Sequence, residues 1–442
     1  MLSTANLSLE QAPPISIPLR FFLSAPLFGL AAGLLLLLGG GEVFASRWSA
    51  PALALTHLLT LGVLAMVMCG AMLQMLPVVA GSPVPRVVLS GGLVHLLLLV
   101  GVPALAGAFL TGDALWMAAA LLALGAAFTL FVLVVGIALW RVTLPSHTVG
   151  GMRAALAALL VTLCIGGYLA GGMVGAWGVA DPLLWTGLHL NWGLLGWVGL
   201  LLVGVSYQVL PMFQVTPEYP LWMRRFWAGG GFVCLSLWLL LGLAAERVGL
   251  PAWLPGLPLW LLGLGYLLFF VVTLRLLARR RRRILNPSLL FWYLGIALAV
   301  AALLLFAGGG WLPDAASATG SPLLMGVLLL GSALSFVNGM LYRIVPFLSW
   351  FHLQHRQLAL LNMSVILPNM KELLPDRWAN LQFYAYLAAV FAALPAPFAP
   401  ESVSRLCGLL VCLSFLLLLS NLLRVAVRYR ATLARLHAPI PS

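Results

Sequence analysis

The sequence predicts an all-α polytopic membrane bundle of twelve transmembrane helices. Of its 442 residues 63% are apolar and only 7% are charged, and its mean hydropathy is +1.10. Soluble domains carry about 25% charged residues. Apolar stretches of roughly 20 residues, the length of a membrane-crossing helix, follow one another along the whole chain. We therefore expect a single integral membrane domain over residues 1–442.

Twelve uncharged stretches are long enough to cross a bilayer. In chain order they lie near 21–39, 52–79, 87–110, 114–140, 154–179, 182–213, 226–245, 252–274, 288–312, 321–342, 378–399 and 406–423. The first lacks a small-residue cleavage site and is followed by eleven more, so it is interpreted as an anchor and not as a cleaved signal. Outside the spans we expect cytoplasmic tails over 1–20 and 424–442. The loop over 351–377 contains LPNMKELLP and is interpreted as a cytoplasmic interfacial segment.

The basic residues predict the orientation of the chain. Twenty of the 23 Lys and Arg residues fall on one side of the predicted spans, and only Arg47, Arg247 and Arg405 fall on the other. Cytoplasmic loops are enriched in Lys and Arg, so both termini are predicted to be cytoplasmic. The net charge of +13 and the run Arg279–Arg283 are read as orientation signals, although the run could also bind lipid headgroups or a partner. A lipid bilayer is the expected partner, and nucleic acid is not.

Three predicted helices share a glycine and proline pattern. GVLAMVMCGAMLQMLP, GWVGLLLVGVSYQVLP and GSALSFVNGMLYRIVP each fit G-x7-G-x6-P and recur at periods of 134 and 135 residues. Glycine and proline are frequent in membrane helices, but three equally spaced matches indicate an internal repeat. The repeat predicts three four-helix units around a pseudo-threefold axis. The pattern positions are Gly62, Gly70, Pro77, Gly196, Gly204, Pro211, Gly331, Gly339 and Pro346.

The repeated glycines give each of these helices a face of small residues. At 100° per residue, the two glycines and the proline fall within an arc of about 80°. Another backbone or a flat cofactor can approach such a face closely. The proline at the inner end is expected to stop or kink the helix.

Three histidines lie within predicted spans. His57 and His189 begin the helices over 52–79 and 182–213, near the same membrane face, and His95 lies inside the helix over 87–110. Neutral imidazole binds haem iron and copper, so His57 and His189 are the candidate metal ligands. The alternative is an interfacial histidine bonded to a carbonyl, water or lipid, and His95 is interpreted as a packing residue.

Polar residues also precede each repeat proline. They are Gln74, Gln208 and Arg343, with Tyr207 and Tyr342 directly before the last two. We interpret them as groups that reach the headgroups, the alternatives being an entry path for protons or ions and, for Arg343, contacts to cofactor carboxylates. The five cysteines show no CxxC spacing, and no P-loop, dinucleotide fingerprint, HExxH or GxSxG motif is present.

The chain resembles subunit I of the haem–copper oxidases. The resemblance rests on the helix count, the repeat, the two histidines and the segments THLLTLG, LHLNWGLLGWVG and YRIVPFLSWFH. That superfamily includes cbb3-type oxidases, nitric oxide reductases and related NnrS-type proteins. The resemblance implies that His57 matches the family's low-spin haem ligand and that His189 matches a copper ligand. It also implies haem b, copper, a bacterial inner membrane and a role in respiratory or nitric oxide metabolism.

The chain departs from the family at its other metal ligands. Residues 226–245 contain no histidine, and neither do residues 323–350, where the family supplies further ligands. A three-histidine copper site cannot be built, so we do not expect dioxygen reduction. Met325 could supply a thioether as a sixth haem ligand, whereas His57 alone would leave the iron five-coordinate and open to small gases.

Two other function classes stay open. One is a cofactor-free transporter of a small solute, although the middles of the spans carry no Asp, Glu, Lys or Arg. The other is a structural or assembly subunit with respiratory-chain or oxidase-assembly partners. Cofactor content separates these classes from a haem protein.

Overall fold

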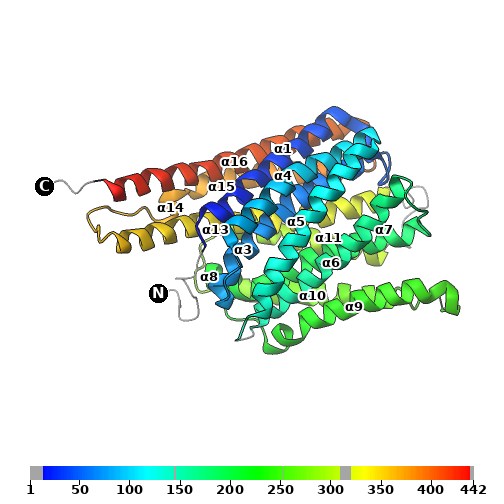
Figure 1. The fold of residues 1–442 in the computed structure, drawn as a ribbon, viewed down its shortest axis with the longest axis horizontal. Coiled ribbons are helices and arrows are strands. Elements are labelled where there is room, and N and C mark those ends of the chain that lie inside the picture. The colour runs from blue at the N-terminus through cyan, green and yellow to red at the C-terminus, as the bar shows by residue number, and fades with distance from the viewer. Residues whose placement is uncertain (1–12, 144–145, 252, 309–319, 439–442) are drawn as a thin grey trace. The chain divides into compact units, whose positions relative to one another are not determined.

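The protein is an all-helical integral membrane protein in the part of the chain that the structure describes (Figure 1). This computed structural model describes residues 13–143, 146–251, 253–308 and 320–438. Within these ranges, eleven helices are long and apolar enough to cross a membrane. A helix satisfies its own backbone hydrogen bonds, which lipid cannot do, and this explains why the apolar stretches fold as helices.

The contacts divide the chain into two compact units. The first comprises, in the described ranges, residues 72–104 and 113–284. Its complete elements are α5 (Ala114–Trp140), α6 (His147–Met173), α7 (Pro182–Asn191), η4 (Trp192–Leu200), α8 (Leu201–Gln214), α9 (Leu221–Val248) and α10 (Leu257–Ala278). α6 packs against the continuous rod of α7, η4 and α8. Gly151 and Gly204 bring the backbones of α6 and α8 together, because a Cβ on Gly204 would lie 2.8 Å from the Cα of Gly151.

The second unit comprises residues 13–71, 105–112 and, in the described ranges, 285–308 and 320–438. Its complete elements are α1 (Ser16–Gly39), η2 (Gly40–Phe44), α2 (Ala50–His57), η3 (Leu58–Ala65), α11 (Pro287–Gly308), α13 (Gly320–Ala359), α14 (Met370–Leu373), α15 (Asp376–Ala393) and α16 (Pro400–His437). α3 (Met66–Ala80) and α4 (Val87–Thr111) each contribute residues to both units. α1 packs along α16, where a Cβ on Gly33 would meet Cys412 Sγ at 2.6 Å.

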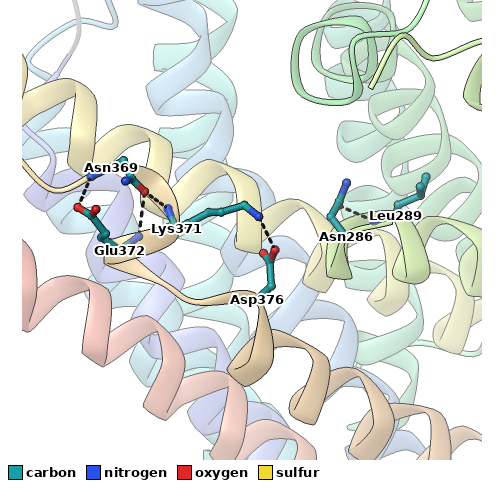
Figure 2. A network of polar contacts seen from close by, with 6 residues as sticks. All are labelled: Asn286, Leu289, Asn369, Lys371, Glu372 and Asp376. Atoms are coloured by element: carbon teal, nitrogen blue, oxygen red, sulfur yellow. Dashed lines mark hydrogen bonds and ion pairs between the residues drawn. The ribbon is translucent and has the colours of Figure 1, made fainter. Parts of the chain in front are cut away.

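Side-chain caps fix several helix starts. Ser49, Asp113, Ser146 and Asp181 each accept a hydrogen bond from a backbone N–H in the first turn of α2, α5, α6 and α7. The short α14 begins with a capping box in which Asn369 and Glu372 each accept from the other's backbone N–H (Figure 2). Lys371 then pairs with Asp376 at 3.0 Å, which ties α14 to the start of α15.

The expected span over 378–399 corresponds to α15, which has 18 residues and begins with Asp376 and Arg377. It is not among the eleven helices that meet the length and composition of a span. α15 runs antiparallel to α16. Asn421 Nδ2 donates to Trp378 O at 3.0 Å near one end, and Cys407 Sγ contacts Ala389 O at 3.9 Å toward the other.

Two helices continue into segments that were expected to lie outside the spans. α13 passes through Pro346 and ends only at Ala359, inside the expected loop 351–377. α16 continues to His437, through most of the expected tail 424–442. No Gly or Pro interrupts 347–359 or 424–437, and Arg, Gln, Leu and Ala there favour helix. Of the expected tail 1–20, residues 1–12 lie outside the described residues, and α1 begins at Ser16.

The repeat prolines do not stop their helices where they occur. Pro77 is followed by helix to Ala80, Pro211 by helix to Gln214, and Pro346 by the long extension of α13. A proline removes one hydrogen bond, but the helix can resume on its far side, as neighbouring groups in membrane bundles often permit.

Candidate functional site

His57 lies where a regular α-helix changes into a π-helix. It is the last residue of α2, and the π-helical segment η3 begins at Leu58. Its Nδ1 lies 2.8 Å from Leu53 O, and its ring centroid lies 5.0 Å from that of Phe109. A carbonyl can only accept a hydrogen bond, so Nδ1 carries the proton. The neutral ring then has its lone pair on Nε2, which is the tautomer that binds a metal through Nε2. The half-buried side chain thus has a fixed tautomer.

His189 has the same tautomer for a different reason. Its Nδ1 lies 3.1 Å from Thr162 O, on the neighbouring helix α6, so its hydrogen bond joins two helices. Gly166 makes room for the ring, because a Cβ there would lie 2.8 Å from His189 Cε1. His189 belongs to the first unit and His57 to the second.

The π-helical segments, rather than the histidines, occupy equivalent positions in the repeat. η3 begins at Leu58 and η4 at Trp192, which is 134 residues later and matches the repeat period. The counterpart of His57 is therefore Asn191, not His189. Asn191 Nδ2 donates to Gly187 O at 2.9 Å, the carbonyl four residues earlier, as His57 does. The two histidines lie near the same end of two repeat-related helices, but at positions that are not equivalent.

π-helical segments are rare and are frequent at functional sites. The corresponding part of the third repeat, at the start of α13, is α-helical. Nothing in the sequence separates π from α at these positions, because LLTLGVLA and WGLLGWVGL are ordinary apolar segments. The spacing of the repeated glycines shows only that the two segments occupy equivalent positions.

The repeated small-residue faces pack against protein. In each repeat, both glycines of the second helix face the first helix of the same repeat, at residues seven positions apart. A Cβ on the second glycine would lie 2.6 to 2.8 Å from α1, α6 or α11, and one on the first glycine 2.5 to 3.2 Å. Helix packing therefore occupies the faces on which a flat cofactor was the alternative. The pairs are Gly62 and Phe28, Gly70 and Phe21, Gly196 and Ala158, Gly204 and Gly151, Gly331 and Leu298, and Gly339 and Phe291.

The polar residues near the repeat prolines differ in their surroundings. Neither amide atom of the buried Gln74 has a hydrogen-bond partner among the described residues. Tyr207 OH donates to Met223 O at 3.2 Å, which joins α8 to α9. Gln208 and Arg343 are half-buried. We infer no shared path for protons or ions from these positions.

Tyr342 belongs to a buried polar cluster that sequence reasoning missed. Its OH donates to Gln382 Oε1 at 3.2 Å and accepts from Asn421 Nδ2 at 3.1 Å, and Gln382 Nε2 donates to Ser414 Oγ at 3.0 Å. The cluster joins α13, α15 and α16 and explains Tyr342 as a residue of helix packing. Uncharged polar residues inside the spans were the available signal.

The ligand set limits which metal centre could form. Among the described residues, no three His, Cys, Asp or Glu side chains are grouped so that they could hold a metal ion, and the five cysteines are free. A copper centre with several imidazoles does not fit these residues. His57 offers one imidazole, whose Nδ1 is held by Leu53 O. Met325 is half-buried in the second turn of α13, and α13 packs directly against η3.

No protein-family model matches the chain, and no curated protein matches its sequence.

Proposed function

We propose that this protein binds haem b through His57, on a scaffold like subunit I of the haem–copper oxidases, and does not reduce dioxygen. The carrying observation is the imidazole at the start of η3, whose Nδ1 is held by Leu53 O at 2.8 Å. Metal-binding histidines commonly donate their second ring nitrogen to a carbonyl in this way. A haem with one axial imidazole would offer a coordination position to a small gas, in keeping with a role in respiratory or nitric oxide metabolism.

The proposed scaffold has twelve transmembrane helices in three four-helix units. The three repeated pairs of first and second helix support it, as does α15, whose contacts return the chain along α16. We propose that both termini are cytoplasmic, because the basic residues gather on that side, and that the membrane is a bacterial inner membrane, as the resemblance implies. If the protein also binds copper, we propose a site in which His189 is the single imidazole ligand.

A structural or assembly subunit of a larger membrane complex is the second candidate. It is compatible with the small-residue faces, which are filled by helices of the same chain, because such a subunit needs no cofactor. Transport of a small solute has weaker support, because the span centres carry no charged residue.

The test is to purify the protein in mild detergent from cells that make haem. Reduced-minus-oxidised absorption spectra, the haem-to-protein ratio and metal analysis are then measured for wild type, His57→Ala and His189→Ala. We expect haem in the wild type, its loss in His57→Ala and its retention in His189→Ala. A folded, colourless and metal-free wild type would reject the haem proposal and leave the structural subunit.

A further inference from the structure

The ends of α13 and α16 run together far beyond the level where their buried polar cluster joins them. Tyr342 OH and Asn421 Nδ2 are 3.1 Å apart at that cluster, and Asn362 Nδ2 donates to Leu436 O at 3.1 Å at the far end. Figure 1 shows the ends of the two helices with α14 beside them. Residues 343–377 and 424–437 therefore form one projection of the second unit.

Arg and Trp side chains mark where this projection leaves the lipid. The guanidinium carbon of Arg424 lies 4.0 Å from the centre of the Trp378 ring, and Arg and Trp are characteristic of the membrane boundary. From Arg424 to Leu436 a helix rises about 18 Å. The headgroup zone on one side of a bilayer is only about 5 to 7 Å thick. With α16 along the membrane normal, this rise places the tip of the projection, residues 355–366 with 430–437, in water, beyond the interfacial position expected for 351–377.

Large apolar side chains are exposed at this tip. Leu361 is 81% exposed and Ile366 is 89% exposed, and Leu358, Leu360 and Met363 are also exposed. Leu361 adopts φ 49°, in the left-handed region where a non-glycine residue costs about 1 kcal/mol or more. The turn thus presents a leucine to solvent at a position that glycine would occupy with less strain. Such grouped apolar exposure outside lipid marks an interaction site.

The charge around these side chains is positive. Arg356, Arg430 and Arg435 are exposed, and the sequence has no Asp or Glu within 355–369 or 430–438. Glu372 and Asp376 are engaged at α14, the latter with Lys371. A second copy of this tip would be repelled by like charge, whereas an acidic surface is complementary.

We propose that the tip of the projection docks a soluble, acidic protein, which places its apolar residues on Leu361 and Ile366 and its carboxylates against Arg356 and Arg435. The apolar contacts provide the affinity and the arginines the selection of partner. This docking does not depend on haem.

The test uses the full-length chain in membranes, with a photo-crosslinking residue at position 361 or 366. The control position is Leu122, which is 75% exposed on the membrane-spanning helix α5. We expect one acidic protein to be crosslinked at 1:1 from both tip positions and not from 122. Its yield from position 366 should fall about tenfold in Leu361→Gly, and several-fold in Arg356→Gln/Arg435→Gln or at high salt.

Leu361→Gly also separates binding from folding. Because glycine accepts the left-handed backbone, the variant should melt no lower than the wild type while losing the adduct. Adducts to lipid alone, to a second copy, or to the chain's own first twelve residues would overturn the proposal. So would the absence of any adduct, or an adduct whose yield ignores salt and the arginine substitutions.

Discussion

His57 and Asn191 are alike in place and differ in chemistry. Both end a regular α-helix, both donate to the carbonyl four residues earlier, and both precede a π-helical segment. Asparagine can satisfy the backbone there as well as histidine can, but only histidine brings a metal-binding nitrogen. The sequence identifies His57 as a candidate, whereas its hydrogen bond depends on a ring orientation that spacing does not encode.

Tyr219 carries a prediction about alkaline stability. It is buried in the segment between α8 and α9, and its OH lies 2.9 Å from Thr273 Oγ1, which itself donates to Phe269 O. Tyr219 is therefore the donor. Burial raises the pKa of Tyr219 above its usual value of about 10, outweighing the opposite effect of the hydrogen bond.

The stabilisation that accompanies the raised pKa of Tyr219 is fully present below about pH 10, where the phenol is protonated in both the folded and the unfolded chain. Above that pH the unfolded chain loses the phenol proton while the folded chain keeps it, so stability falls as pH rises. Tyr219→Phe should cost about 1 kcal/mol at pH 7 and lose stability less steeply above pH 10. Thermal unfolding in detergent from pH 8 to 11 measures both, and equal slopes for the two proteins would contradict the assignment.

Among the helices, the repeat specifies how the second helix of each repeat packs on the first. The glycine pattern predicts three small-residue faces, and each faces the first helix of its own repeat. Which neighbour would fill the faces could not be predicted, because a phenylalanine, an alanine or another glycine all serve as partners. The prolines were also expected to stop or kink their helices, but each helix continues beyond its proline. Charge and apolarity decide where a span leaves the lipid, but not where its helix ends.

Two glycine substitutions test this packing with opposite signs. Gly204→Ala should lower the free energy of unfolding by about 1 to 3 kcal/mol, because its Cβ would lie 2.8 Å from backbone of α6. Gly230→Ala in α9 meets nothing within 4 Å and should raise it by about 0.5 to 1 kcal/mol. Thermal unfolding in the same detergent compares them, and equal effects would show that the close approach is unimportant.

For the whole molecule, hydropathy predicted the helical class and most helix positions. Charge explains the misplaced ends: the apolar runs of α13 and α16 stop well before their helices do. The candidate site was only half predicted. His57 could be named as a candidate from the sequence, but the π-helical segment after it could not, and the buried cluster around Tyr342 joins helices distant in sequence.

The number of crossings can be tested at the chain ends. If α15 crosses the membrane, twelve spans place both termini on the same side. We expect reporters fused before residue 1 and after residue 442 both to report the cytoplasm, in agreement with the basic residues. Reporters on opposite sides would leave eleven crossings and remove α15 from the membrane.

Axial ligation by His57 is tested most directly by replacing the imidazole. His57→Gly should purify folded but with little haem, and imidazole added during growth and purification should restore the haem-to-protein ratio and the reduced-minus-oxidised spectrum. His189→Gly, treated in the same way, should keep its haem throughout. The account is contradicted if His57→Gly without imidazole holds as much haem as the wild type, with an unchanged spectrum.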